Sequence, residues 1–167
     1  NRAAKAVAML QQSLDQAATD EPGHLIRLLL IARFQLNQTD KIDDDFRKAF
    51  KKFPQHEPDL RYRWASSHLM REDRPTYIRL LIETHEKFPD HPPTNNDLGY
   101  LWIEQHEHLE QALQMVRKAV DAEPNNAAYL DSLGWAYYKL AQFDDAVVWL
   151  RKSEQQAQAD RRQRTTI

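Results

Sequence analysis

The sequence predicts an all-α protein assembled from repeated helical hairpins, and three observations lead to this prediction. Leu, Ala, Gln, Arg, Lys and Glu dominate the chain of 167 residues, and these residue types favour helices. Glycine occurs only 3 times, which is too rare for the many tight turns of a sheet-rich fold. Pro54, Pro89 and Pro124 each follow an amphipathic run and stand 35 residues apart. A fixed period of this length is typical of stacked supersecondary units.

About nine helices are expected, separated by turn-forming residues. Each proline closes a helix, because proline lacks an N–H donor and restricts the residue before it. Asp59, Asn95 and Asn126 have side chains suited to start the helices that follow the three prolines. The predicted helices span residues 2–18, 24–37, 41–53, 58–71, 74–87, 94–106, 109–122, 127–140 and 143–158.

Two glycines lie inside predicted helices, at the same phase of the repeat. Gly99 and Gly134 are 35 residues apart. Because glycine in a helix interior costs about 1 kcal/mol relative to alanine, we expect a partner helix to approach closely at both positions. The expected contacts are Ala112 for Gly99 and Ala146 for Gly134. Ala112 follows its glycine by thirteen residues and Ala146 by twelve, so the turn around His106 carries one extra residue.

Residues 93–153 contain two copies of a recognisable motif. The first copy has Leu98, Gly99, Trp102, Ala112, Ala119 and Pro124, and the second has Asn125-Asn126, Leu133, Gly134, Tyr137 and Ala146. This pattern resembles the tetratricopeptide repeat, and the two copies are similar to the final repeats of large bacterial tetratricopeptide proteins, several of them envelope-associated. Over residues 57–89 the resemblance is degenerate, with Trp64-Ala65 in place of Leu-Gly and His68 in place of the aromatic residue. Over residues 1–54 it rests mainly on helical period and on Pro54.

The resemblance implies a right-handed α-solenoid, a superhelix of antiparallel helix hairpins. The first helix has no partner before it, so we expect it to be the second half of a truncated repeat in a fragment of a larger protein. The expected organisation is the second helix of a truncated repeat at 1–22, degenerate repeats at 23–56 and 57–91, regular repeats at 92–126 and 127–160, and a polar tail at 161–167.

The last predicted helix carries an apolar face made by Ala146, Val147, Trp149 and Leu150. Repeat arrays of this kind usually end in a polar capping helix, and residues 156–167 lack an apolar stripe of their own. Either the natural chain continues over this face, or a second copy of the chain covers it and forms a homo-oligomer.

The resemblance also implies a binding surface, because the first helix of each hairpin lines the concave side of a solenoid. The groove positions carried over from the family are Tyr62, Ser66, Met70, Asn96, Tyr100, Ile103, Asp131, Trp135, Tyr138 and Lys139. Aromatic side chains are effective anchors for a partner, so the predicted partner is a protein or peptide held in an extended or helical form. The alternative for each position is packing between helices, above all for Trp135.

One family subtype binds an acidic C-terminal tail through a clamp of lysine and asparagine side chains. Asn96 and Lys139 match part of that clamp, but the paired basic residues are missing and Asp131 opposes an acidic ligand. Recognition of a terminal carboxylate is therefore not predicted.

No catalytic, cofactor or metal site is predicted. The chain has no cysteine, no glycine-rich phosphate loop and no nucleophile elbow. His106 and His108 are alternate residues of one short turn and do not converge as zinc ligands do. The run Asp43-Asp44-Asp45 lacks the alternating spacing of a calcium loop and suits a helix N-terminus instead.

The charge and hydropathy of the chain limit the classes of partner that can be expected. The net charge is −2 and the pI is about 6.4, so nothing indicates a general attraction to nucleic acid. The longest apolar run, residues 28–32, is too short to span a bilayer, and direct membrane insertion is not predicted. The sequence leaves the compartment open, with bacterial cytoplasm and cell envelope both compatible.

The predicted function is a non-catalytic scaffold for protein–protein interaction. Two alternatives stay open at this stage. Related 35-residue helical hairpins can read single-stranded RNA one base per repeat, and titration with RNA at moderate salt separates that hypothesis from peptide binding. The segment could also be the docking or regulatory part of an enzyme whose catalytic domain lies elsewhere.

Overall fold

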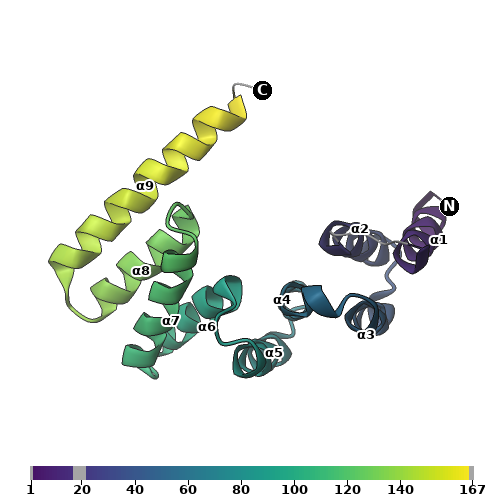
Figure 1. Cartoon of the computed structure of the whole chain (residues 1–167), viewed down its shortest axis with the longest axis horizontal. Coiled ribbons are helices and arrows are strands. Elements are labelled where there is room, and N and C mark those ends of the chain that lie inside the picture. The colour runs from purple at the N-terminus through teal and green to yellow at the C-terminus, as the bar shows by residue number, and fades with distance from the viewer. Residues whose placement is uncertain (1, 17–21, 166–167) are drawn as a thin grey trace. The chain divides into compact units, whose positions relative to one another are not determined.

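The computed structural model describes residues 2–16 and 22–165, and every regular element in this part of the chain is a helix (Figure 1). The elements are α1 (Arg2–Gln16), α2 (Pro22–Gln35), η1 (Thr39–Lys41), α3 (Ile42–Lys52), η2 (Pro54–His56), α4 (Glu57–Met70), α5 (Arg74–Lys87), α6 (Pro92–Gln105), α7 (Leu109–Ala122), α8 (Ala127–Lys139) and α9 (Phe143–Thr165). The chain divides into two compact units, residues 1–80 and 81–167, and the boundary falls within α5.

The predicted helices are confirmed within the described residues, although most of their bounds differ by one or two residues and the last helix is longer than predicted. α6 begins at Pro92 rather than at residue 94, because proline fixes the backbone angle that a first helical turn needs. α9 continues to Thr165 rather than ending at residue 158, so the predicted polar tail is helical over its first residues (Figure 1). No proline or glycine follows residue 143 to end α9 earlier. The predicted end of the first helix at residue 18 lies outside the described residues.

One of the three predicted helix starters is confirmed. The Asn126 side chain accepts hydrogen bonds from the backbone N–H groups of Ala128 (3.1 Å) and Tyr129 (3.4 Å), so it caps α8. Asn95 is wrong as a starter, because it lies inside α6 and donates instead to the carbonyl of Pro89 at 2.9 Å. Asp59 is also wrong, since α4 begins at Glu57.

The three prolines end three helices in the same way. α3, α5 and α7 end at Lys52, Lys87 and Ala122, two residues before each proline. The next residue in each case donates its N–H to the carbonyl four residues back: Phe53 to Ala49 (2.8 Å), Phe88 to Thr84 (2.8 Å) and Glu123 to Ala119 (3.0 Å). The 35-residue period read from the sequence is therefore a period of the backbone hydrogen bonding.

A second repeated turn joins the two helices of each hairpin. Each turn has a residue with a left-handed backbone just after the first helix. The residue that follows it donates its N–H to the carbonyl five positions back at 2.9 Å, as at many helix C-termini. The left-handed residues are Asn37 (φ 54°), Glu72 (φ 61°), His106 (φ 56°) and Ala141 (φ 57°). The turn after α6 carries the extra residue that the sequence predicts, and His108 there is left-handed as well (φ 48°).

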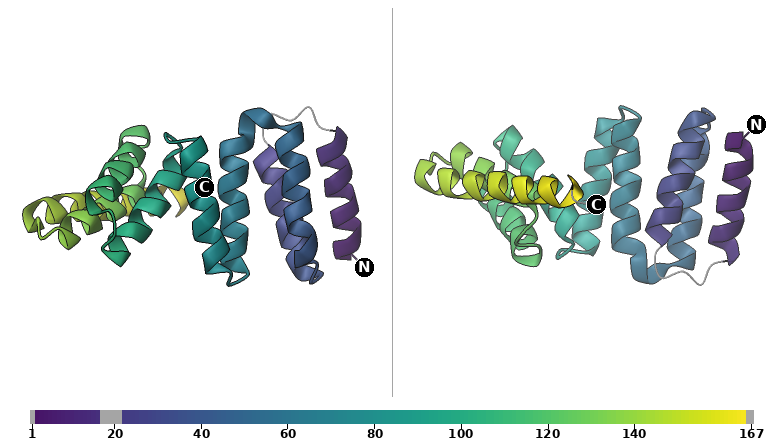
Figure 2. Two further views of the ribbon diagram at one scale, coloured as in Figure 1. Left: turned by 90° about the horizontal axis from the view of Figure 1, so that it is seen from below. Right: turned by 90° about the horizontal axis from the view of Figure 1, so that it is seen from above.

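The first unit has its own core, formed by α1 to α4. In Figure 2 these helices lie side by side with nearly parallel axes. Ile42, Phe46 and Leu60 are completely buried at its centre. A buried ion pair joins α2 to α3, because Asp45 accepts hydrogen bonds from Arg33 Nε (2.9 Å) and Nη2 (3.2 Å).

The core of the second unit lies among α6, α7, α8 and α9. Leu133, Ala136 and Val116 are buried at its centre. A Cβ atom added to Gly99 would lie 2.8 Å from Val116 Cγ2 and 3.0 Å from the carbonyl oxygen of Ala112. The predicted close approach of Gly99 to Ala112 is therefore confirmed.

Gly134 also faces a partner helix closely, as predicted, and the nearest residue of that helix is Leu150. A Cβ atom at Gly134 would lie 2.7 Å from Leu150 Cγ and 3.0 Å from the backbone nitrogen of Leu150, one turn beyond Ala146. Ala146 is buried in the same core. Val116 follows Ala112 by four residues and Leu150 follows Ala146 by four, so both glycines meet the partner helix in the same register once the extra turn residue after α6 is counted.

The apolar face predicted on the last helix is mostly used within the second unit. Ala146 is buried, Leu150 packs against Gly134, and Trp149 lies against the core. Val147 and Val148 are the large apolar side chains that stay exposed there. Contact with a second copy through α9 stays a prediction.

Candidate functional site

The second unit exposes a group of aromatic side chains along α6, α8 and the start of α9. We name Tyr100, Trp135, Tyr138 and Phe143 the aromatic ladder. The rings of Trp135 and Tyr138 are stacked, with centroids 5.1 Å apart and planes at 19°. The ring of Phe143 lies 5.8 Å from that of Tyr138. Residues 135 and 138 are one turn apart on α8, so helical geometry itself places these two rings together.

The ladder aromatics are exposed to an unusual degree for large rings. The exposed fraction is 58% for Phe143, 48% for Tyr138 and 37% for Tyr100, whereas Trp135 is half-buried. Clustered exposed aromatics mark interaction surfaces more often than isolated ones do. The predicted alternative for Trp135, packing between helices, holds in part, because it also contacts the core of the second unit.

Polar groups from both helices hold the ladder in place. The indole N–H of Trp135 on α8 donates to the carboxylate of Glu104 on α6. The Lys139 ammonium lies 3.8 Å from the same carboxylate and 5.1 Å from the centroid of the Trp135 ring. These contacts join α6 to α8, so the exposed rings stand on a braced pair of helices.

The ladder lies in a negative electrostatic field. Burial raises the pKa of the Tyr100 hydroxyl, and the negative charges of Glu104 and Asp131 raise it further. Both carboxylates therefore lie close enough to Tyr100 to disfavour a negative charge on it. The same field favours a positively charged group at this face.

Of the predicted groove positions on the second unit, the structure brings five together. Tyr100, Asp131, Trp135, Tyr138 and Lys139 lie on one face, linked by the contacts given above. These five positions come from α6 and α8, the first helices of the two regular hairpins.

Two predicted groove positions on α6 are wrong. Ile103 is 1% exposed and belongs to the core of the second unit. Asn96 is 7% exposed, and its amide nitrogen donates to the carboxylate of Asp97 at 3.1 Å. Both residues face neighbouring helices because the α6 face open to solvent is narrower than the helical pattern suggests.

Asn96 and Lys139 are the two residues that match part of the carboxylate clamp. Asn96 is buried, and Lys139 is engaged by Glu104 and by the ring of Trp135. The expectation that the chain does not recognise a terminal carboxylate stays a prediction.

The three remaining predicted positions lie on α4 in the first unit. Tyr62 is half-buried, and the Ser66 hydroxyl donates to the Tyr62 carbonyl at 2.9 Å, within the helix itself. Met70 is 63% exposed. Their part in binding stays a prediction.

Sequence reasoning missed Phe143. Positions were carried over from the first helix of each hairpin, whereas Phe143 opens the second helix of its hairpin. It reaches Tyr138 because the turn between α8 and α9 is tight. The sequence signal that could have identified it is a phenylalanine placed directly after a predicted turn.

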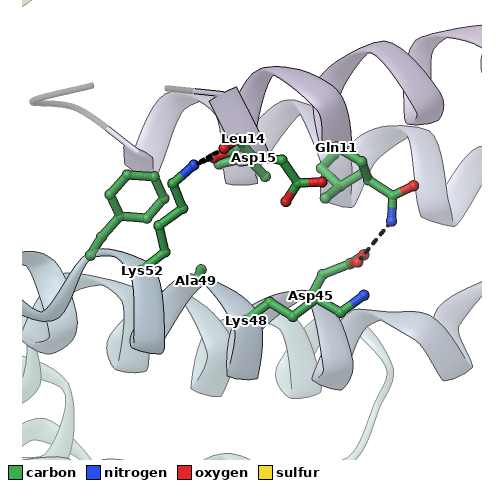
Figure 3. Close-up of a pocket in the computed structure, with 9 residues that line it drawn as sticks. Gln11, Leu14, Asp15, Asp45, Lys48, Ala49 and Lys52 are labelled. Atoms are coloured by element: carbon green, nitrogen blue, oxygen red, sulfur yellow. Dashed lines mark hydrogen bonds between the residues drawn. The ribbon is translucent and has the colours of Figure 1, made fainter. Parts of the chain in front are cut away.

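The first unit contains a pocket of about 240 Å³ between α1 and α3 (Figure 3). The Lys52 ammonium donates to the carbonyls of Leu14 and Asp15, the last carbonyls of α1, and Gln11 donates to Asp45 at 3.3 Å. A cation at a helix C-terminus satisfies carbonyls that have no partner within the helix. These contacts give the polar side chains of the pocket a structural role.

Within the described residues, no three or more His, Cys, Asp or Glu side chains converge to hold a metal ion. The three consecutive aspartates diverge: Asp45 pairs with Arg33, Asp44 with Arg47 at 2.7 Å, and Asp43 with Arg71 at 2.9 Å. Across the same part of the chain, no helix combines the length and apolar character that crossing a membrane requires.

The chain is similar in sequence and structure to known repeat proteins, although it matches no protein-family model. It is 28% identical over 146 residues to the TPR repeat-containing protein PA4667 of Pseudomonas aeruginosa. This match covers 86% of the chain but only 25% of that relative, so the chain spans about a quarter of its length.

Solved structures share the fold. The crystal structure of MamA matches with a TM-score of 0.60 at 15% identity, covering 93% of this chain and 89% of MamA. YrrB, described as a TPR protein with an unusual peptide-binding site, matches with a TM-score of 0.58 at 16% identity, covering 93% of this chain and 78% of YrrB. The chain therefore shares the fold of these repeat proteins, an array of antiparallel helix hairpins.

Proposed function

We propose that the chain is a non-catalytic interaction module that binds a polypeptide partner through the aromatic ladder. The observation that carries this proposal is the stacked pair of half-buried Trp135 and exposed Tyr138, braced across two helices by Glu104. Rigid aromatics lose little conformational entropy on binding, which makes them effective anchors. The peptide-binding site named for YrrB, a protein of the same fold, gives the proposal further support.

A polypeptide suits this face better than RNA does. Stacked rings can hold nucleic-acid bases, but a backbone of phosphates needs positive charge beside the rings. The ladder has the carboxylates of Glu104 and Asp131 there, and its one lysine is engaged by Glu104.

The test is selection from a displayed library of 12-residue peptides, followed by calorimetry with the enriched peptides. We expect micromolar binding to the unmodified chain and at least a tenfold loss in the double variant Tyr100→Ala, Tyr138→Ala. Because both rings are exposed, the melting temperature of the double variant should change little.

Val148→Ala is the matched control, since it removes another exposed apolar side chain from the same unit. Equal binding to the double variant would move the site away from the ladder. Extensive unfolding of the double variant would mean that these rings stabilise the core, and binding of single-stranded RNA alone would overturn the proposal.

A further inference from the structure

The charges beside the aromatic ladder are not balanced. Lys139 lies 3.8 Å from Glu104, so these two charges offset each other. Asp131 is exposed on α8 and, within the described part of the chain, takes part in no ion pair. The face therefore presents one carboxylate whose charge is not compensated nearby.

The rings of the ladder already show which chemistry they attract. The Lys139 ammonium sits 5.1 Å from the centroid of Trp135. A cation over an aromatic face is attracted by the electrons of the ring. Tyr138 is stacked on the same Trp135 and remains 48% exposed, so it offers a second ring to a cation from outside the chain.

The ladder is also directional. Asp131 lies near the start of α8, Tyr138 lies seven residues later, and Phe143 follows the turn. At about 1.5 Å per residue, Asp131 and Tyr138 are roughly 10 Å apart along the helix axis. An extended peptide covers this distance in about three residues, at roughly 3.3 Å each.

We propose that the ladder binds an extended polypeptide segment with an arginine facing Asp131 and an apolar side chain about three residues away facing Tyr138 and Phe143. Arginine fits because its planar guanidinium pairs with a carboxylate through two hydrogen bonds and stacks on aromatic rings. Burial is the main cause of the raised pKa of Tyr100, and the negative charges of Glu104 and Asp131 beside it, which add to the shift, also attract a cation at this end. This inference rests on the proposed function and adds the chemistry and direction of the partner.

Three tetrapeptides test the proposal, each with blocked termini: Arg-Ala-Ala-Phe, citrulline-Ala-Ala-Phe and Glu-Ala-Ala-Phe. Citrulline keeps the shape of arginine without its charge. Binding is followed by the NMR shift of the Trp135 indole N–H, which is assigned by its loss in Trp135→Phe. We expect the arginine peptide to bind at least tenfold tighter than the citrulline peptide, and the glutamate peptide to bind weakest.

Asp131→Asn should abolish most of the preference for arginine. Asp121→Asn should preserve it, because that variant removes an exposed carboxylate on α7 instead. A second result expected is weaker binding of the arginine peptide at higher salt, because the contact is an exposed charge pair. Reversing the order to Phe-Ala-Ala-Arg should also weaken binding.

Equal binding of the arginine and citrulline peptides, or an unchanged preference in Asp131→Asn, would overturn this inference. The proposed function would survive that result if library-selected peptides still required Tyr100 and Tyr138. If neither the selected peptides nor the tetrapeptides depended on the ladder, both proposals would be wrong. Shifts caused by oligouridylate in place of the arginine peptide would also overturn both.

Discussion

In the second unit, the helices of a hairpin meet through glycine, whereas in the first unit polar side chains connect helices both within a hairpin and between successive hairpins. Gly99 and Gly134 allow partner helices to approach until backbone and side-chain atoms touch. In the first unit, Trp64-Ala65 takes the place of Leu98-Gly99 in the motif. The Trp64 ring lies 5.6 Å from that of Phe50, and its N–H donates to Asp43 at 2.9 Å.

The polar network of the first unit continues around His68, which takes the place of the motif's aromatic residue. Its ring nitrogens lie 3.1 Å from the Asp73 carboxylate and 3.3 Å from that of Asp43. Arg71 also places its guanidinium beside Asp43, at 2.9 Å. Both units nevertheless have the same hairpin turn, so the backbone geometry of the repeat does not require one particular contact between helices.

The largest expected effect comes from breaking the buried ion pair of the first unit. Asp45→Leu should lower the free energy of unfolding by about 3 to 5 kcal/mol, because it leaves Arg33 buried without its partner. The double variant Arg33→Met, Asp45→Leu should recover most of this loss. Chemical denaturation measures both. Asp44→Ala is the control, since its pair with Arg47 is exposed and should contribute less than about 1 kcal/mol.

The second-largest effect is expected from filling the space at a glycine of the second unit. Gly134→Leu should destabilise the protein by about 3 kcal/mol, because the new side chain meets Leu150, including its backbone nitrogen. Thermal and denaturant melting measure the loss. Gly23→Ala is the matched control: a Cβ there meets only the flexible end of the Arg63 side chain, so stability should hold or rise. Equal changes in stability in the two variants would contradict the close helix contact assigned to Gly134.

Carboxylates of the first unit should make its stability depend on acid. Burial acts to raise the pKa of Asp43, but hydrogen bonds from Trp64 and Arg71 and the Arg71 charge outweigh it and lower the pKa. A hydrogen bond from Thr76 lowers the pKa of Asp73. Carboxylates with a depressed folded-state pKa contribute stability above their ordinary value of 3.8 and lose it as pH falls through the folded value.

Stability is therefore expected to fall below about pH 4. Asp43→Asn should be less stable near neutral pH and should lose less on acidification than the unmodified chain. Unfolding curves from pH 6 to pH 2.5 test this difference. Parallel curves for the two proteins would show that Asp43 does not carry the dependence.

The smallest expected effect concerns the hairpin turns, which both units share. Ala141 has φ 57°, a conformation that strains a residue with a Cβ atom. Ala141→Gly should stabilise the protein by about 0.5 kcal/mol after the greater freedom of glycine in the unfolded chain is subtracted. Gln114→Gly, within α7, should instead lose about 1 kcal/mol. A loss at both positions would contradict the role assigned to the turn.

Most of the helices and their ends could be predicted from the sequence, because local chemistry determines them. Proline ends a helix wherever it falls, and Asn126 caps α8 with its own side chain. The failures at Asn95 and Asp59 have a local cause too, since a proline at the start of a helix lets the helix begin earlier.

The candidate site could be predicted only in part. The positions carried over from the family include Trp135 and Tyr138, whose rings are stacked in the structure. They also include Ile103, which is buried, because each first helix has neighbours on several sides and a rotation of one residue exchanges the open face for a buried one. The sequence of α6 alone does not show how the helix is rotated against its neighbours.

The sequence by itself determined the helices, the 35-residue period and the need for close helix contact at two glycines, because backbone propensity and side-chain size act locally. Only the tertiary structure decided that Leu150 faces Gly134, that Phe143 completes the ladder and that Asp131 is left without a balancing charge. These depend on contacts between residues distant along the chain, which are set by the mutual packing of whole helices.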